Sequence, residues 1–131
     1  MIVVDSSVWI AQLGGERTLA TQALHAAIAE DSVLIGDLIL LELLLGTRDD
    51  THAAWIDAMM DPFPIVPMLD VAVATEAARN YRRLRGRGIT VRKTNDLIIG
   101  TFCLSFGYLL LHNDRDFDPM ATYLGLLTIG V

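Results

Sequence analysis

The chain opens with Met1-Ile-Val-Val-Asp-Ser-Ser-Val-Trp-Ile10, and this stretch decides the fold. Its residues 2–4 are short, wholly apolar and β-branched, which is typical of a strand buried on both faces. Ser6 or Ser7 then offers an N-cap for a helix that begins near Val8. Asp5 is therefore predicted at the carboxyl end of a parallel strand, where open α/β sheets bind ligands. A carboxylate buried there needs a positive partner.

The same alternation of apolar strands and helices continues along the chain. Further strands are predicted at 33–35, 109–111 and 126–129, and residues 63–66, bracketed by prolines, are predicted as a short strand or an extended edge segment. Helices are predicted at 18–29, 38–45, 50–60, 70–85 and 96–106. This order implies right-handed crossovers between parallel strands. We therefore predict an α/β fold, with a central parallel sheet of four to five short strands and helices on both faces, in a single domain spanning residues 1–131.

The composition predicts a cytoplasmic protein that contacts other proteins. Hydrophobic residues make up 53% of the 131, so we expect a partner or a second copy to cover part of the apolar surface. Cys103 is the only cysteine, which excludes an internal disulfide and suits a reducing compartment. The first residues lack the basic region and cleavage site of a signal peptide. The most apolar stretch, 32–46, is too short to span a bilayer.

The charge pattern is uneven. A net charge of −6 argues against simple electrostatic binding to a nucleic acid. Seven of the ten basic residues nevertheless lie between positions 79 and 93: Arg79, Arg82, Arg83, Arg85, Arg87, Arg92 and Lys93. Two interpretations stay open, a solvated helix face and an RNA-binding face. Helical spacing predicts that Arg79, Arg82, Arg83 and Arg87 share one side, with Arg85 pointing elsewhere.

Four acids occupy positions that such a fold can bring together. Asp5 follows the first strand, Asp114 follows the strand at 109–111, and Asp96 lies in the first turn of a helix. Asp96 could serve only the helix dipole, and Asp114 could be only a turn residue. Glu42 is harder to explain structurally, because its helix is apolar and positions 38 and 46 offer no basic partner. It must be paired, metal-bound or neutral, unless it lies on a solvent-facing stripe.

Taken jointly, these carboxylates predict a divalent cation. Two carboxylates ~6 Å apart repel by roughly 3 kcal/mol at an effective dielectric near 20, and a cation or a proton relieves this repulsion. Ligands that are all oxygen select Mg²⁺ or Mn²⁺, whereas zinc prefers Cys and His. Cys103 is expected in the core, and His25 and His52 on helix surfaces.

The ordered set of acidic motifs resembles that of PIN-domain ribonucleases. The matching segments are Val3-Val-Asp-Ser-Ser-Val8, the lone Glu42 of an apolar helix, Thr94-Asn-Asp-Leu-Ile-Ile-Gly100 and Asn113-Asp-Arg-Asp-Phe117. Length and motif order resemble the VapC-type toxins of toxin–antitoxin pairs. The resemblance implies a Mg²⁺-dependent endoribonuclease, with Mn²⁺ as a possible substitute, that has a cognate antitoxin and forms a homodimer.

The resemblance also implies roles for single residues. Asp5, Glu42, Asp96 and Asp114 would bind the metal and carry catalysis, with Asp116 as a secondary acid. Ser7, His112 and Asn113 would be supporting polar groups. The family usually has Thr or Ser where this chain has His112, which is either a substitute donor or without a role. From the basic run, Arg82, Arg83, Arg87, Arg92 and Lys93 would bind single-stranded or looped RNA.

Two alternatives stay open at this point. A receiver- or dehalogenase-like domain would use Asp5 for phosphoryl transfer, but a dehalogenase-like site wants a second acid where this chain has Ser7. An inactive PIN domain would serve only in assembly.

Overall fold

The structure, a computed structural model, describes residues 1–129 and contains a four-stranded parallel sheet in the order β3-β2-β1-β4. The strands are β1 (Ile2–Val4), β2 (Val33–Gly36), β3 (Ile65–Val66) and β4 (Leu109–Leu111). The helices are α1 (Ser6–Leu13), α2 (Leu19–Ala29), α3 (Asp37–Leu45), α4 (Asp50–Met60), α5 (Val71–Arg85), α6 (Thr94–Phe106) and α7 (Asp118–Leu124), with a 3₁₀ turn at Arg115–Phe117. The predicted α/β class with a central parallel sheet is confirmed.

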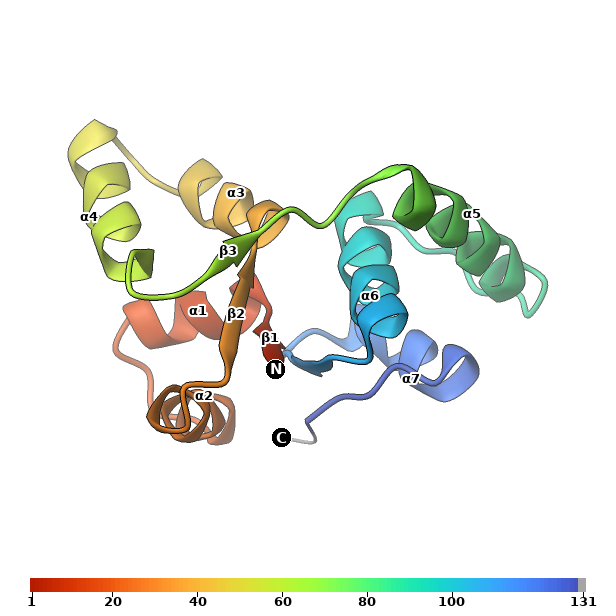
Figure 1. Cartoon of the computed structure of the whole chain (residues 1–131), viewed down its shortest axis with the longest axis horizontal. Coiled ribbons are helices and arrows are strands. Elements are labelled where there is room, and N and C mark those ends of the chain that lie inside the picture. The colour runs from red at the N-terminus through yellow and green to blue at the C-terminus, as the bar shows by residue number, and fades with distance from the viewer. Residues whose placement is uncertain (130–131) are drawn as a thin grey trace.

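Helices flank the sheet. In the view of Figure 1, α1, α2 and α4 lie to the left of β1, α3 lies above β2, and α5 to α7 lie to the right of β1. The strands are short but fully apolar, so the sheet supplies the centre of the core: Val3, Val4, Ile35, Leu110 and Leu111 are all buried. None of the helices within residues 1–129 has both the length and the apolar run needed to cross a membrane.

One predicted strand is largely absent. Residues 126–129 form only an isolated parallel bridge, between Thr128 and Leu110 of β4. The N–H of Leu110 donates to the carbonyl of Leu127 at 2.9 Å. Leu126 instead turns into the core, where it is 4% exposed. The N–H of Leu126 donates to the carbonyl of Met120 in α7 at 3.2 Å, so within the described residues the pairing with β4 begins only at Leu127.

The helix N-termini also correct the sequence interpretation. Asp5, and neither Ser6 nor Ser7, is the N-cap of α1, because its side chain accepts the N–H of Ser7. The helix predicted from residue 96 begins earlier, at Thr94, and Lys93 occupies the N-cap position of α6 without a side-chain capping hydrogen bond. A carboxylate accepts backbone N–H groups as well as a hydroxyl does, so an acid at a strand end can begin the next helix.

Candidate metal centre

The candidate site is built where β1 and β4 end side by side. The two strands pair in parallel, with Ile2 opposite Leu109 and Val4 opposite Leu111. The N–H of Asp5 continues the ladder by donating to the carbonyl of Leu111 at 2.9 Å. The residues that follow the two strands, Asp5 on one side and residues 112–116 on the other, therefore lie at the same edge of the sheet.

Asp5 is buried, with only 3% of its surface exposed. Its Oδ2 accepts hydrogen bonds from the backbone N–H of Ser7 at 3.1 Å and from the Ser7 hydroxyl at 2.6 Å. Its Oδ1 is also buried and has no hydrogen-bond partner. One carboxylate oxygen of Asp5 is thus held in place, and the other is left free to bind a ligand.

Ser7 joins the two strand ends. While its hydroxyl donates to Asp5, its Oγ accepts the backbone N–H of Asn113 at 3.1 Å. Ser7 therefore fixes the carboxylate of Asp5 relative to the loop after β4. Asn113 contributes its main-chain N–H to this contact, whereas the residue as a whole is exposed.

Glu42 reaches the site from α3. Its Oε1 lies 3.4 Å from the hydroxyl of Ser6, which donates to it. Burial raises the pKa of Glu42, and the charge of Asp5 raises it further. Glu42 is half-buried and is not on a freely solvated stripe. Sequence reasoning considered Ser6 only as a candidate N-cap and gave it no role in the site, although a hydroxyl directly after Asp5 was the available signal.

Asp96 lies in the first turn of α6 and is 3% exposed. Burial raises its pKa to about 7, and the charge of Asp5 is the next largest cause. Its Oδ2 is buried without a hydrogen-bond partner. The dipole of α6 favours a negative charge at this position, but the interaction is too weak to outweigh the burial and repulsion that raise the pKa.

Asp114 and Asp116 form the outer part of the site. One carboxylate oxygen from each lies within 4.8 Å of an Asp96 oxygen and of the other. The ammonium of Lys93 lies 3.0 Å from Oδ2 of Asp114 and 3.5 Å from Oδ2 of Asp116. Burial alone would raise the pKa of Asp114, but hydrogen bonds from the Asp116 N–H and the Lys93 ammonium outweigh it and lower the pKa. The outer part thus has a cation of its own.

His112 shapes the loop that carries Asp114. Its Nδ1 accepts the backbone N–H of Asp114 at 3.2 Å, and its ring packs against Phe117 with centroids 5.0 Å apart. A Thr or Ser hydroxyl at this position could accept the same N–H. His112 therefore acts as a hydrogen-bond acceptor toward the loop, rather than as a donor to Asp114.

The donor set fits a hard divalent cation. The side chains grouped closely enough to share one ion are the carboxylates of Asp96, Asp114 and Asp116, whereas zinc favours thiols and imidazoles. The His112 imidazole uses its Nδ1 to accept the Asp114 N–H, and Cys103 is buried in the core, as expected. Two of the site's oxygens, Oδ1 of Asp5 and Oδ2 of Asp96, are buried without a hydrogen-bond partner. Unpartnered buried carboxylate oxygens are costly unless a cation meets them. The site is therefore suited to Mg²⁺ or Mn²⁺.

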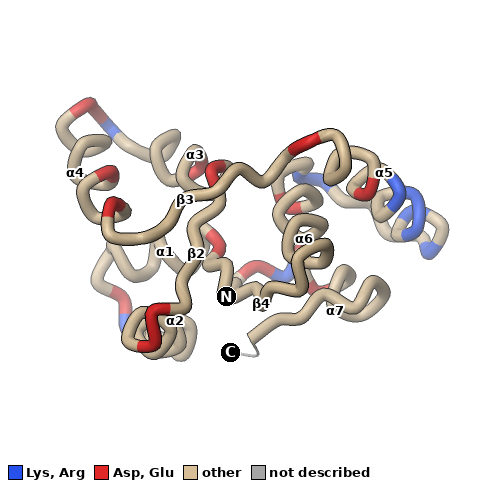
Figure 2. The backbone as a smooth tube through the Cα atoms, in the orientation of Figure 1, with Lys and Arg blue, Asp and Glu red and all other residues tan. Residues whose placement is uncertain are grey.

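The arginines do not form one face, contrary to the sequence prediction. In Figure 2 the basic segments follow α5 and the loop after it, whereas the acidic segments are spread over the chain. Arg82 and Arg85 line a pocket with Thr94 of α6. Arg83 lies in a separate pocket with Ser105, near the other end of α6. Because successive side chains rotate around a helix, Arg82 shares a surface with Arg85 and not with Arg83.

The remaining basic residues also separate. Arg79 pairs with Glu76 at 2.8 Å, and the guanidinium of Arg87 lies over the ring of Tyr123, 4.8 Å from its centroid. Arg92 is exposed. Only Lys93 of the predicted RNA-binding residues makes an ion pair with the candidate site within residues 1–129.

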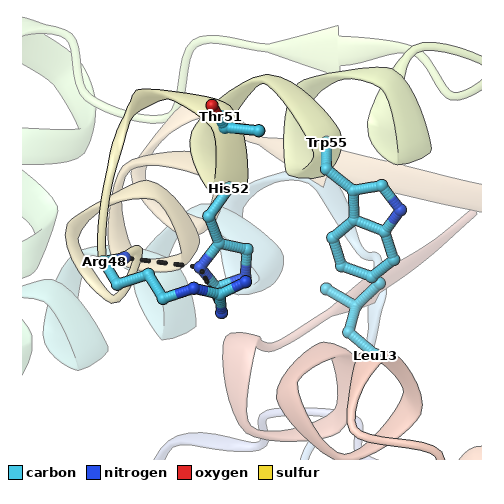
Figure 3. Close-up of a pocket in the computed structure, with 5 residues that line it drawn as sticks. All are labelled: Leu13, Arg48, Thr51, His52 and Trp55. Carbon is cyan, nitrogen blue, oxygen red and sulfur yellow. Dashed lines mark hydrogen bonds between the residues drawn. The ribbon is translucent and has the colours of Figure 1, made fainter.

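A second concave surface lies between α1 and α4. Figure 3 shows its lining, with Trp55 next to Leu13 and with the Arg48 guanidinium beside the ring of His52. The pocket has a volume of about 490 Å³. Trp55 is 46% exposed and the neighbouring Ile10 is 60% exposed. Trp9, in contrast, is only 2% exposed, because it packs against Phe63.

Similarity to known proteins agrees with the fold. Ribonuclease VapC11 of Mycobacterium tuberculosis is 28% identical over 128 residues, which are 96% of each chain. The structure of VapBC2 from Rickettsia felis, bound to a DNA fragment from their promoter, matches 98% of each chain with a TM-score of 0.80 at 15% identity. VapBC-5 from Mycobacterium tuberculosis matches 98% of this chain and 97% of its own, with a TM-score of 0.68 at 25% identity.

The fold is that of an α/β protein with a parallel sheet, and its buried acids form an acidic site at the carboxyl ends of the strands. The PIN domain model matches residues 2–122, so the chain belongs to the PIN domain family. The match favours this family over the receiver- and dehalogenase-like alternatives.

Proposed function

We propose that this chain is a VapC-type endoribonuclease, the toxin of a toxin–antitoxin pair, and that it requires Mg²⁺ or Mn²⁺. The observation that carries the proposal is a pair of buried carboxylate oxygens without a hydrogen-bond partner, Oδ1 of Asp5 and Oδ2 of Asp96. The carboxylates of Asp114 and Asp116 lie close to Asp96. Family membership and the similarity to a VapC ribonuclease support the assignment.

The proposed mechanism divides the work among the acids. Asp5, Asp96 and Asp114 would hold the cation, with Asp116 as a secondary acid. When bound, the cation would lower the pKa of a water molecule and stabilise the charge that develops on the phosphate. Glu42, held by the Ser6 hydroxyl, would complete the ligand set or orient the attacking water. Ser6, Ser7 and His112 keep the carboxylates in register through the hydrogen bonds described above.

RNA is the proposed substrate, bound as a single strand or a loop. Arg82 and Arg85 are the best placed of the arginines, because their pocket includes Thr94, which directly follows Lys93. Arg92, which is exposed and directly precedes Lys93, is proposed to contact the same RNA strand. Arg83 and Arg87 remain RNA-binding candidates from the sequence, but their local contacts lie away from this pocket.

A cognate antitoxin is the proposed protein partner. The surface between α1, α3 and α4 offers it exposed apolar side chains, among them Ile10 and Trp55. Part of this surface also includes Glu42, so a bound antitoxin segment would approach the acids. A homodimer is proposed as well, and Leu69 and Val71, which are 50% and 85% exposed, are available to a second copy.

The test is cleavage of a single-stranded RNA pool by the purified chain in Mg²⁺. We expect product fragments that disappear in a chelator and return with Mg²⁺ or Mn²⁺. Asp96→Asn should be inactive under the same conditions, and an exposed acid of α4, Asp57, supplies the control Asp57→Asn. RNA that stays intact with wild-type protein in both metals, across the pool, would assign the chain to assembly instead.

A further inference from the structure

Lys93 is the only lysine in the chain; the other nine basic residues are arginines. It lies at the N-cap position of α6, three residues before Asp96. Its side chain is 57% exposed, so the ammonium is accessible to solvent while it contacts the carboxylates. A lone lysine at the candidate metal centre is a feature that the proposed function leaves unexplained.

The ammonium lies among the outer carboxylates. Its Nζ is 3.0 Å from Asp114, 3.5 Å from Asp116 and 3.9 Å from Asp96, each time to the Oδ2 atom. Only the contact with Asp114 is a hydrogen bond. These are the same three residues whose oxygens lie close enough together to hold a metal ion. The lysine therefore occupies a place that a second divalent cation would need.

The inner part of the site, Asp5 and Asp96, has no cation within hydrogen-bond distance among residues 1–129. Oδ1 of Asp5 is buried without a hydrogen-bond partner, and Oδ2 of Asp96 has only the 3.9 Å ion pair with Lys93, which is too long for a hydrogen bond. The two parts thus differ in charge balance. The outer pair of acids is met by an ammonium, and the inner oxygens are left for a divalent ion.

We propose that the Lys93 ammonium is a resident cation of the carboxylate site, which holds Asp114 and Asp116 and limits the site to one tightly bound divalent ion. This inference rests on the proposed function only in taking the site to bind a divalent cation. A second ion at the outer carboxylates would have to displace the ammonium or bind against its charge. Removing the ammonium opens the outer carboxylates to a second ion.

The chemistry of lysine suits this role. Its ammonium is a compact charge with three donors on a flexible stem, so it can approach several carboxylates at once. The planar guanidinium of arginine favours a bidentate contact with one carboxylate. Among residues 1–129, no arginine takes part in the ion pairs of the site, although Arg92 and Arg115 are next to its residues in the sequence.

The test counts divalent ions without RNA. Mn²⁺ binding to metal-free protein is measured by titration calorimetry and by electron paramagnetic resonance of the free ion. We expect one tightly bound ion in wild type and two in Lys93→Met, with the second bound at least tenfold more tightly than any second ion of wild type. Lys93→Arg, which keeps the charge, should bind one ion tightly. Arg92→Met is the matched control, since it removes the neighbouring cation, and should behave as wild type.

The outcomes separate this inference from the proposed function. If wild type and Lys93→Met bind one ion each with equal affinity, the role of Lys93 is wrong and the metal-dependent function stands. If neither protein binds Mn²⁺, both are wrong. An extra ion in Arg92→Met as well would also overturn the inference, because the effect would then follow from net charge and not from the position of Lys93.

A second measurement needs no variant. Because Lys93 is the only lysine, its acetylation by acetic anhydride can be followed on one peptide by mass spectrometry. We expect slower acetylation than in the denatured chain, and a rate unchanged within twofold when one equivalent of Mg²⁺ binds. Acetylation that rises to the denatured rate on binding the first ion would show that the ammonium is displaced, and the inference would fail.

Discussion

The acids and the arginines of this protein show opposite relations between sequence and space. Asp5 and Asp114 are more than a hundred positions apart, yet the ends of β1 and β4 place them at one edge of the sheet. Arg82 and Arg83 are adjacent, yet they line different pockets on α5. Parallel strands bring distant residues together, and a helix separates neighbours. A run of like charges is therefore weaker evidence for a site than dispersed acids at strand ends.

The largest effect is expected from removing a buried acid. Asp96→Asn should lower RNA cleavage by about 10³-fold or more, because it removes a ligand from the place where charge develops. The metal-free protein should become more stable, since a buried charge and its repulsion are removed. Cleavage assays and thermal unfolding in a chelator measure the two effects. An insoluble variant would show that Asp96 acts as a structural cap.

Binding of the cation should stabilise the folded protein through the acids and not through the arginines. A ligand that binds only the folded chain stabilises it by about 2.7 kcal/mol at 100 times its Kd, or roughly 10 °C in Tm. We expect such a rise with Mg²⁺ or Mn²⁺ in wild type. Asp5→Asn removes the charge of the carboxylate whose Oδ1 has no hydrogen-bond partner, so this variant should lose most of the rise in Tm. Arg79→Ala should keep the rise in Tm. Equal melting temperatures of wild type in chelator and in millimolar Mg²⁺ would count against the site.

The acids should also give the metal-free protein an unusual pH dependence. Burial raises the pKa of Asp96 to about 7 from its ordinary value of 3.8, so the folded state binds this proton more tightly than the unfolded state. Stability should therefore rise as pH falls from about 8 toward 5. Asp96→Asn should flatten the curve, and so should saturating Mg²⁺, which keeps the carboxylate ionised. Urea unfolding in a chelator across this range tests the sign.

His112 offers a smaller change at the edge of the acid site. His112→Ala removes the acceptor of the Asp114 N–H, so the loop should hold Asp114 less firmly and cleavage should fall by about tenfold, the scale of one hydrogen bond. His112→Thr replaces the imidazole with a hydroxyl and should recover most of the activity. Steady-state cleavage rates compare the three proteins. If Thr and Ala are equally impaired, the packing of the ring against Phe117 matters more than the hydrogen bond.

The arginines should give the smallest effects, and they should differ by pocket. If Arg82 and Arg85 contact phosphates, the double alanine variant should weaken RNA binding and flatten the slope of log affinity against log salt by about 0.7 per lost contact. Arg79→Ala with Arg83→Ala should leave the slope unchanged. Binding is measured in Ca²⁺ at several salt concentrations. Equal slopes in all three proteins would reassign α5 to solubility or to antitoxin contact.

The sequence alone determined the class of fold and the positions of the acids. Short apolar strands that end in Asp5 or lead to Asp114 predict a parallel sheet with both acids at its carboxyl edge, because strand direction and side-chain pattern are local properties. The lone Glu42 of an apolar helix was likewise visible as a charge that needed a partner. The predicted alternation of strands and helices was confirmed within residues 1–129.

Only the tertiary structure decided which groups meet. The contact of Ser6 with Glu42, the bridge of Ser7 between two strand ends and the place of Lys93 among the acids all join residues from different elements. The burial of Trp9 and the separation of Arg82 from Arg83 depend on how the helices pack. Such contacts are set by register and packing across the chain, and no short stretch of sequence contains them.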